Sequence, residues 1–155
     1  MDLRLDQVID QDGQLGFDLV TDGVLLATEE GLRTAVVVSL FTDARAGDDD
    51  RLPDGGADRR GWWADTWPEF EGDNTGSHLW LLAREKQLPL VLERARRYAR
   101  AALQWLIDDG IAAEVSVDAS FPRTGVLLLE VVIERLLDGP VRYRFEQFWS
   151  DANAV

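Results

Sequence analysis

The chain contains no cysteine, a single histidine and a single lysine. Without thiols it can form neither a disulfide nor a thiolate zinc site, and nothing in its composition indicates that it works in an oxidising compartment. The histidine, His78, follows a candidate helix N-cap, and the chain has no Gly-x-Ser-x-Gly elbow and no phosphate-binding glycine loop. We therefore expect no catalytic triad and no cofactor, and we predict that His78 is solvated or locally hydrogen-bonded.

Basic residues are also scarce, with 16 arginines and lysines against 29 acidic residues and a formal net charge of -13. Nucleic acids and anionic membranes both require a positive surface, so neither is an expected partner. The longest apolar runs, such as residues 35–38 and 126–129, are too short to cross a bilayer, and the first residues lack the basic start and apolar block of a signal peptide. These absences favour a soluble protein that is used without secretion.

The composition is that of a globular protein. With 155 residues, 46% of them hydrophobic, the chain is predicted to form one domain, residues 1–155, around its own core. Residues 43–60 are rich in glycine and aspartate and have little to bury, so we predict a mobile surface loop. Calcium binding there is not expected, because the spacing lacks the glycine and terminal glutamate of an EF-hand. The aspartates concerned are Asp48, Asp50, Asp54 and Asp58.

Periodicity and capping signals predict three helices. Thr28 is a candidate N-cap for a first helix that should end near Thr42, and Ser77 is a candidate N-cap for a short second helix. The third is the longest. It carries one apolar stripe from Pro89 at its first turn to the left-handed stop expected at Gly110.

Alternation of apolar and polar residues predicts strands at both ends of the chain. Residues 3–27 suggest an N-terminal hairpin or three-element meander, and residues 115–121, 126–137 and 141–148 suggest two or three further strands. Within the last strand, Val141, Tyr143 and Phe145 should face inward while Arg142, Arg144 and Glu146 face outward. The predicted fold is α+β, a small antiparallel sheet packed by the long amphipathic helix and one or two shorter helices.

Tryptophan is concentrated in a short stretch of the chain. Such aromatic rings are either core residues or anchors of a protein interface. Trp80 and Trp105 lie on predicted helices and are expected in the core. Adjacent Trp62 and Trp63, in an extended segment, would point to opposite sides. The candidates for contact with a partner are Trp62, Trp63, Trp67 and Phe70.

Carboxylates beside these aromatic residues leave an enzymatic alternative open. Glycoside hydrolases use two carboxylates about 5–10 Å apart, together with rings that stack on sugars. Acids are so abundant in this chain that their proximity in sequence means little. The candidate pair would come from Asp65, Glu69, Glu71 and Asp73.

Four motifs follow one another in the chain: Gly61-Trp62-Trp63-Ala64-Asp65, Gly76-Ser77-His78-Leu79-Trp80-Leu81-Leu82, Tyr98-Ala99-Arg100-Ala101-Ala102-Leu103-Gln104-Trp105-Leu106 and Asp108-Asp109-Gly110. Preceded by a helix that ends in Leu40-Phe41-Thr42-Asp43 and followed by strands, this ordered set resembles the Mu-like phage baseplate protein family. That family is related to the short baseplate wedge protein of contractile tails. The resemblance covers about residues 15–137.

The resemblance implies a structural protein without catalytic residues, located in the tail baseplate of the virion and in the host cytoplasm during assembly. It implies other baseplate wedge proteins and the tail sheath protein as partners, with six copies per tail. Wedge relatives can template sheath assembly by strand addition, so the strand at 141–148 or its neighbour becomes a candidate receiving edge. The residues that this adds to the interface candidates are Arg142, Tyr143, Arg144 and Phe145.

The chain also departs from the wedge relatives. They often end the long helix with an acidic-Pro-Arg motif, whereas residues 107–110 here read Ile-Asp-Asp-Gly. Any contact made by that arginine is therefore in doubt. Because some wedge relatives are labelled lysozymes, a peptidoglycan-cleaving tail enzyme is the alternative function. A third reading is an acidic module that binds some other host or phage protein.

Overall fold

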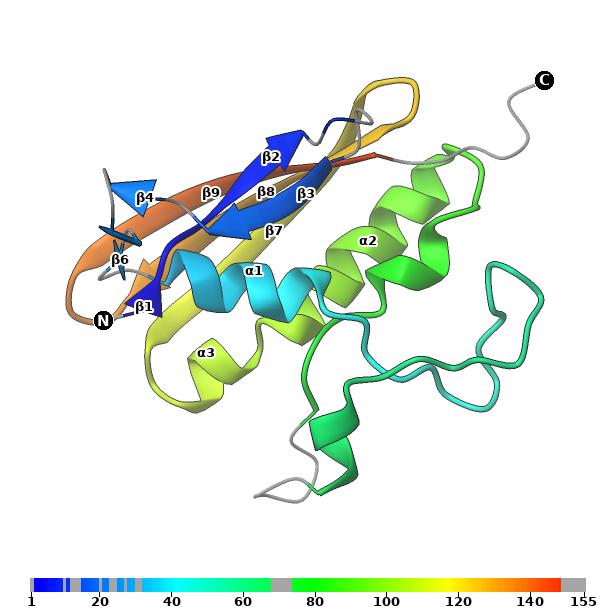
Figure 1. Ribbon diagram of the computed structural model, residues 1–155, viewed down its shortest axis with the longest axis horizontal. Helices are drawn as coiled ribbons and strands as arrows, with labels where there is room; N and C mark the ends of the chain where they lie inside the picture. The colour runs from blue at the N-terminus through cyan, green and yellow to red at the C-terminus, as the bar shows by residue number, and fades with distance from the viewer. Residues whose placement is uncertain are drawn as a thin grey trace.

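The computed structural model describes residues 2–9, 11, 15–19, 21–22, 25–26, 28–29, 32–67 and 74–148. Its centre is an antiparallel sheet with the strand order β7-β8-β9, and the helices pack on one side of it (Figure 1). The strands are β7 (Ala112–Arg123), β8 (Val126–Arg135) and β9 (Gly139–Phe148), and the α-helices are α1 (Arg33–Phe41), α2 (Pro89–Ala102) and α3 (Trp105–Asp108). The α+β fold predicted from the sequence is confirmed.

Burial along β8 follows the predicted pattern. Side chains at 127, 129, 131 and 133 are completely buried against the helices. Val126 and Leu128, which face the other side, are 2% and 6% exposed, whereas Glu134 at the far end is exposed. A strand that is apolar on both faces belongs in the middle of a sheet, and β8 does lie between β7 and β9.

The N-terminal residues form the predicted hairpin. Strand β2 (Leu5–Ile9) pairs antiparallel with β3 (Leu15–Leu19). The hairpin packs through Phe17, whose ring centroid lies 4.8 Å from that of Phe41 on α1 and 6.4 Å from that of Phe145 on β9. Shorter pairs join β1 (Asp2–Leu3) to β6 (Thr28–Glu29) and β4 (Thr21–Asp22) to β5 (Leu25–Leu26).

The predicted start of the first helix is wrong. Thr28 lies in β6, paired with Leu3, and α1 begins only at Arg33, whereas its end at Phe41 agrees with the prediction. The backbone groups of Thr28 can be satisfied by a strand ladder as well as by a helix, and threonine favours strands. Pairing with a segment 25 residues earlier in the chain therefore overrides the local capping signal.

The long helix is interrupted at Leu103, which is a second correction. The N–H of Leu103 donates to both Ala99 O and Arg100 O at 3.2 Å, and the chain then starts the short helix α3. The break turns Leu103 and Leu106 toward the core, where both are fully buried, and lets Trp105 Nε1 donate to Ser39 Oγ at 3.0 Å. Gly110, with a φ of 70°, provides the predicted left-handed stop.

Residues 43–60 contain no α-helix and run along one end of the molecule. Their backbone closes on itself, since Ala46 N–H donates to Arg59 O at 2.9 Å, and Ala44 and Ala46 are buried. The guanidinium of Arg60 binds Asp43 at 2.7 Å and lies 4.4 Å above the ring of Trp80. The mobility of this loop and the single-domain organisation of residues 1–155 stay predictions.

Candidate functional site: an exposed tryptophan turn and two sheet edges

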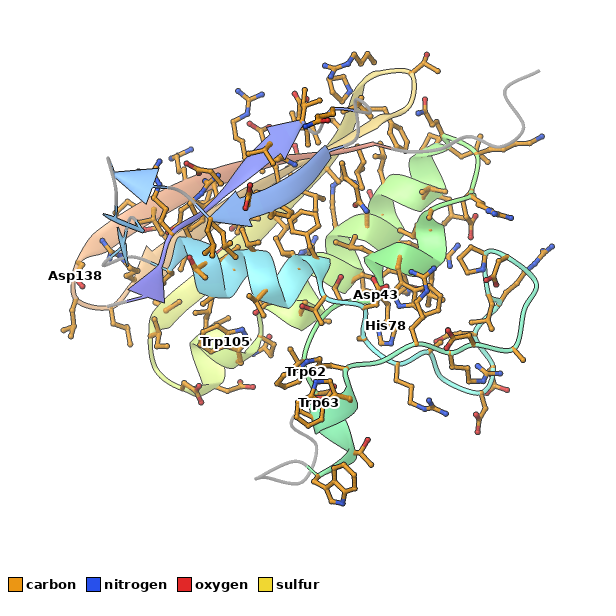
Figure 2. The ribbon with its side chains drawn as sticks, viewed as in Figure 1. Asp43, Trp62, Trp63, His78, Trp105 and Asp138 are labelled. Atoms are coloured by element: carbon orange, nitrogen blue, oxygen red, sulfur yellow. The ribbon has the colours of Figure 1, made fainter. Side chains whose placement is uncertain are left out.

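The tryptophan turn, residues 61–67, contains the 3-10 helix η1 (Trp63–Thr66) and projects from the body of the molecule (Figure 1). Trp62, Trp63 and Trp67 are 44%, 73% and 79% exposed. The prediction that Trp62 and Trp63 point to opposite sides is wrong: both are exposed and their ring centroids lie 5.8 Å apart (Figure 2). The alternation of a strand does not apply here, because Trp62 is extended while Trp63 already begins η1.

Both ends of the tryptophan turn are held by residues that the sequence motifs contain. Gly61 has a φ of 108°, and a Cβ there would lie 2.8 Å from the Cβ of Arg45, so only glycine lets the chain pass this close. Asp65 accepts the N–H of Thr75 with both carboxylate oxygens, at 3.0 and 3.2 Å. The exposed rings therefore sit on a backbone that is anchored at both sides.

The motif at residues 76–82 is hydrogen-bonded to residues 42–44, next to the Arg45 that Gly61 contacts. Ser77 N–H donates to Thr42 O at 2.9 Å and Ala44 N–H donates to Ser77 O at 3.0 Å, which makes a parallel bridge. Trp80 lies on the 3-10 helix η2 (Leu79–Leu82), is 5% exposed as predicted, and donates Nε1–H to Ala44 O at 2.8 Å. Trp80 is therefore a core residue that fixes the loop.

Two polar residues of this motif have local structural roles. The hydroxyl of Ser77 is buried and donates to Leu40 O at 2.5 Å, and it accepts the N–H of Leu79 at 3.3 Å. The Nε2 of His78 donates a hydrogen bond to Arg45 O at 2.9 Å. The ring centroid of His78 lies 5.7 Å from that of Tyr98. His78 is thus hydrogen-bonded, but to a carbonyl 33 residues away in sequence and not within its own turn as the prediction had it.

Among the described residues there is no pair of the candidate carboxylates that the enzymatic alternative requires. Of the four candidate carboxylates, only Asp65 belongs to the described residues, and it binds the backbone of Thr75; Glu69, Glu71, Asp73 and the interface candidate Phe70 lie outside them. Within the described ranges, no three His, Cys, Asp or Glu side chains are arranged to hold a metal ion. In the same ranges, no helix has the length and apolar character needed to cross a membrane.

The outer edge of β9 is covered at one end. Gln7 on β2 reaches over Glu146: its Nε2 donates to Glu146 O, and Glu146 N–H donates to Gln7 Oε1 at 3.2 Å. Because outward and inward backbone groups alternate along an antiparallel strand, Pro140, Arg142 and Arg144 share the outward orientation of Glu146. Pro140 has no N–H. Among the described residues nothing bonds the outward backbone groups of Arg142 and Arg144.

The outer edge of β7 is closed at Ala119 by an ion pair. Ala119 N–H donates to Asp118 Oδ1 at 2.9 Å, and Ala119 O accepts from Arg96 Nη2 at 3.0 Å. Arg96 on α2 also binds Asp118 directly at 3.0 Å. Such a side-chain cap blocks strand addition at Ala119, whereas among the described residues no side chain caps the outward backbone groups of Arg142 and Arg144 on β9. Sequence reasoning missed Gln7 and Arg96, because no local pattern marks a side chain that bonds a distant strand.

The four interface candidates on β9 divide by orientation. Arg142 and Arg144 are exposed, with Arg144 paired to Glu130 at 3.2 Å, and Tyr143 is half-buried. Phe145 is 1% exposed and its ring packs 5.6 Å from that of Phe41. The side chain of Phe145 therefore serves the core, and a partner at this edge would meet the two arginines.

Comparison with known proteins identifies the family. The model of the family described as phage protein GP46 matches residues 32–139. The chain is 47% identical over 124 residues to the baseplate protein gp46 of Escherichia phage Mu, covering 80% of this chain and 83% of that protein. It is 44% identical over 134 residues to the Mu-like prophage FluMu protein gp46 of Haemophilus influenzae, covering 86% and 90%. The tryptophan turn, its supporting motif and strands β7 and β8 lie within the matched residues, and the chain belongs to the phage protein GP46 family.

Proposed function

We propose that this phage baseplate structural protein is a wedge subunit of a contractile tail, joining the wedge to the first ring of the sheath through protein contacts. Six copies per tail would assemble from subunits folded in the host cytoplasm. The relative from phage Mu, which is described as a baseplate protein, supports the structural role. The observation that carries the proposal is the tryptophan turn, an exposed aromatic surface on an anchored backbone.

The physical case for a protein interface rests on the cost of leaving these rings in water. Trp63 and Trp67 are 73% and 79% exposed, so most of their apolar surface is free to be buried by a partner. Tryptophan dominates the binding energy of protein interfaces, and truncating one hot-spot residue costs about 2–4 kcal/mol. An anchored backbone lowers the entropy lost on binding. We infer that the tryptophan turn contacts another wedge protein.

Replacing Trp63 and Trp67 together with serine tests this contact. The exposed rings contribute little to the fold, so the free energy of unfolding should change by less than about 1 kcal/mol. Baseplates assembled with the variant should lack the subunit, and infectious particles should fall by at least about 100-fold, the ratio that a loss of about 3 kcal/mol implies. Complementation of a deletion phage and electron microscopy of the tails would measure both effects.

The matched control is Leu137→Ser, which removes an apolar side chain that is 93% exposed on the β8–β9 turn. Normal tails with this variant would show that loss of exposed apolar surface alone is not the cause. Normal tails with the double tryptophan variant would remove the tryptophan turn from the proposal.

The β9 edge supports the sheath half of the proposal. An extended arm of another protein can add to the outward N–H and C=O groups of Arg142 and Arg144, while Gln7 covers the next outward position at Glu146. Two exposed arginines on this strand, in a chain of net charge -13, would favour an arm that carries acidic side chains.

Arg142→Pro is designed to remove one outward donor without breaking the sheet. Proline is tolerated on an edge strand when its missing N–H faces solvent, as the native Pro140 shows two residues earlier. We expect a folded subunit that enters baseplates but on which sheaths fail to start, seen as bare tubes by electron microscopy. Arg142→Ala keeps the N–H and serves as the control for the side chain. Normal sheaths on Arg142→Pro baseplates would exclude strand addition at this position.

A further inference from the structure

A basic hollow of about 450 Å³ lies between residues 51–55 and the segment that precedes α2. Its floor is apolar, because Leu81 is buried and Leu52 and Pro53 are half-buried. Three exposed basic side chains line it, Arg51, Arg84 and Lys86.

Among the described residues, no carboxylate pairs with these three cations. None of them forms a hydrogen bond or ion pair with any residue that the structure describes, whereas the neighbouring Arg60 and Arg94 each bind one. Such a group of unpaired cations is unexpected in a chain with 29 acidic residues. A partner that carries carboxylates would neutralise this group.

The two acids that line the basic hollow do not neutralise it. Glu85 is held by Arg94. Asp54 is turned toward its own loop, where the Gly56 N–H donates to its Oδ1 at 3.0 Å. This hydrogen bond holds the pKa of Asp54 below its usual value, and the charges of Arg60 and Arg84 act in the same direction. The lining of the basic hollow therefore keeps an excess of positive charge, because the Asp54 carboxylate stands against the three cations Arg51, Arg84 and Lys86.

The complementary surface lies at the opposite end of the same chain. The acidic tip, defined as Ile107, Asp108 and Asp109, is exposed at the end of α3, with 36% of Ile107 accessible. Within the described ranges no basic side chain pairs with either aspartate, and Gln104 donates to Asp108 at 3.0 Å. Figure 1 places α3 at one end of the molecule and the loop of residues 45–60 at the other.

We propose that the acidic tip of one copy of this chain occupies the basic hollow of a second copy. Asp108 and Asp109 would face Arg84 and Lys86, and Ile107 would cover the apolar floor. Each copy keeps a free hollow at one end and a free tip at the other, so the contact is head-to-tail and builds a ring or an open chain of subunits. This inference does not depend on which wedge or sheath protein the subunit meets.

Two opposing electrostatic effects decide how the contact depends on salt. The net charge of -13 makes two copies repel each other at long range, but the repulsion is screened beyond about 8 Å at physiological ionic strength. The tip and hollow attract each other at short range. If this local attraction holds the copies together, added salt weakens the association, whereas a purely apolar contact between repelling copies would strengthen.

Sedimentation velocity of the full chain from about 5 to 500 µM, a range suited to a small interface, tests the proposal. The hollow variant carries Arg84→Glu and Lys86→Glu, and the tip variant carries Asp108→Lys and Asp109→Lys. The matched control carries Arg97→Glu and Arg100→Glu, which reverses two exposed arginines of α2 away from both surfaces. We expect concentration-dependent association of the wild type and control, and association weakened at least about tenfold in either variant.

An equimolar mixture of the two variants is the decisive measurement. The intact tip of the hollow variant can enter the intact hollow of the tip variant, and the acidic hollow of the first attracts the basic tip of the second. The mixture should therefore recover the concentration-dependent association that each variant alone has lost. A wild type that stays monomeric at low salt overturns the proposal and leaves an acidic segment of another protein as the occupant. Association that salt strengthens, or that both variants retain, also overturns it.

Discussion

Replacing Gly76 with alanine is expected to lower the free energy of unfolding by about 4 kcal/mol, because backbone strain and a backbone clash add together. The φ of Gly76 is 101°, and a Cβ there would lie 2.3 Å from Thr42 O and 2.8 Å from Thr42 C. These atoms belong to a hydrogen-bonded bridge, in which Ser77 N–H donates to Thr42 O at 2.9 Å. Either the bridge opens or the chain moves away from it. Urea unfolding followed by tryptophan fluorescence measures the loss.

Gly110→Ala separates the two contributions to this loss. Gly110 also has a positive φ, of 70°, but a Cβ there would meet no atom within 4 Å. Its replacement should therefore cost only the strain of the left-handed backbone, about 1–2 kcal/mol. If Gly76→Ala costs no more than Gly110→Ala, the close approach to Thr42 contributes nothing. A clash at Gly76 would also displace the bridge that supports the tryptophan turn, so baseplate incorporation should fall with stability.

Phe145→Ala is expected to lower the free energy of unfolding by about 3–5 kcal/mol, the usual cost of removing a buried aromatic ring. Phe145 is 1% exposed and joins three parts of the fold. Its ring meets those of Phe17 on the hairpin and Phe41 on α1, with centroids 6.4 and 5.6 Å away, and the guanidinium of Arg33 lies 5.4 Å from it. Truncation leaves a cavity that the hairpin, the helix and the sheet cannot all close.

Phe145→Leu keeps most of the buried volume and should cost less than about 1.5 kcal/mol. Combining Phe145→Ala with Phe17→Ala should cost about 0.5–1.5 kcal/mol less than the sum of the single losses, because both remove the same edge-to-face contact. Strictly additive losses would show that the hairpin packs on β9 without help from this pair.

The prediction of a small antiparallel sheet under helices succeeded where one periodicity acts over many residues. Alternation within residues 126–135 places Leu127 and Leu129 in the core whichever partners they meet, because the burial of apolar surface is the largest driving force for folding. Its position on a predicted helix likewise placed Trp80 in the core, where it is 5% exposed. The prediction failed where two local conformations of a residue have similar free energies. Thr28 can cap a helix or join a strand, and Leu103 can continue a helix or end it.

By themselves, the residues of this chain determined the fold class, the buried stripes of its strands and helices, and a net charge of -13. Each of these follows from composition or from a repeating pattern, which is local information. Only the tertiary structure decided that Gln7 covers the edge of β9, that Arg96 and Asp118 close the edge of β7, and that Trp62 and Trp63 share one surface. Gln7 and Glu146, for example, are 139 residues apart in sequence, and nothing but the folded chain brings them together.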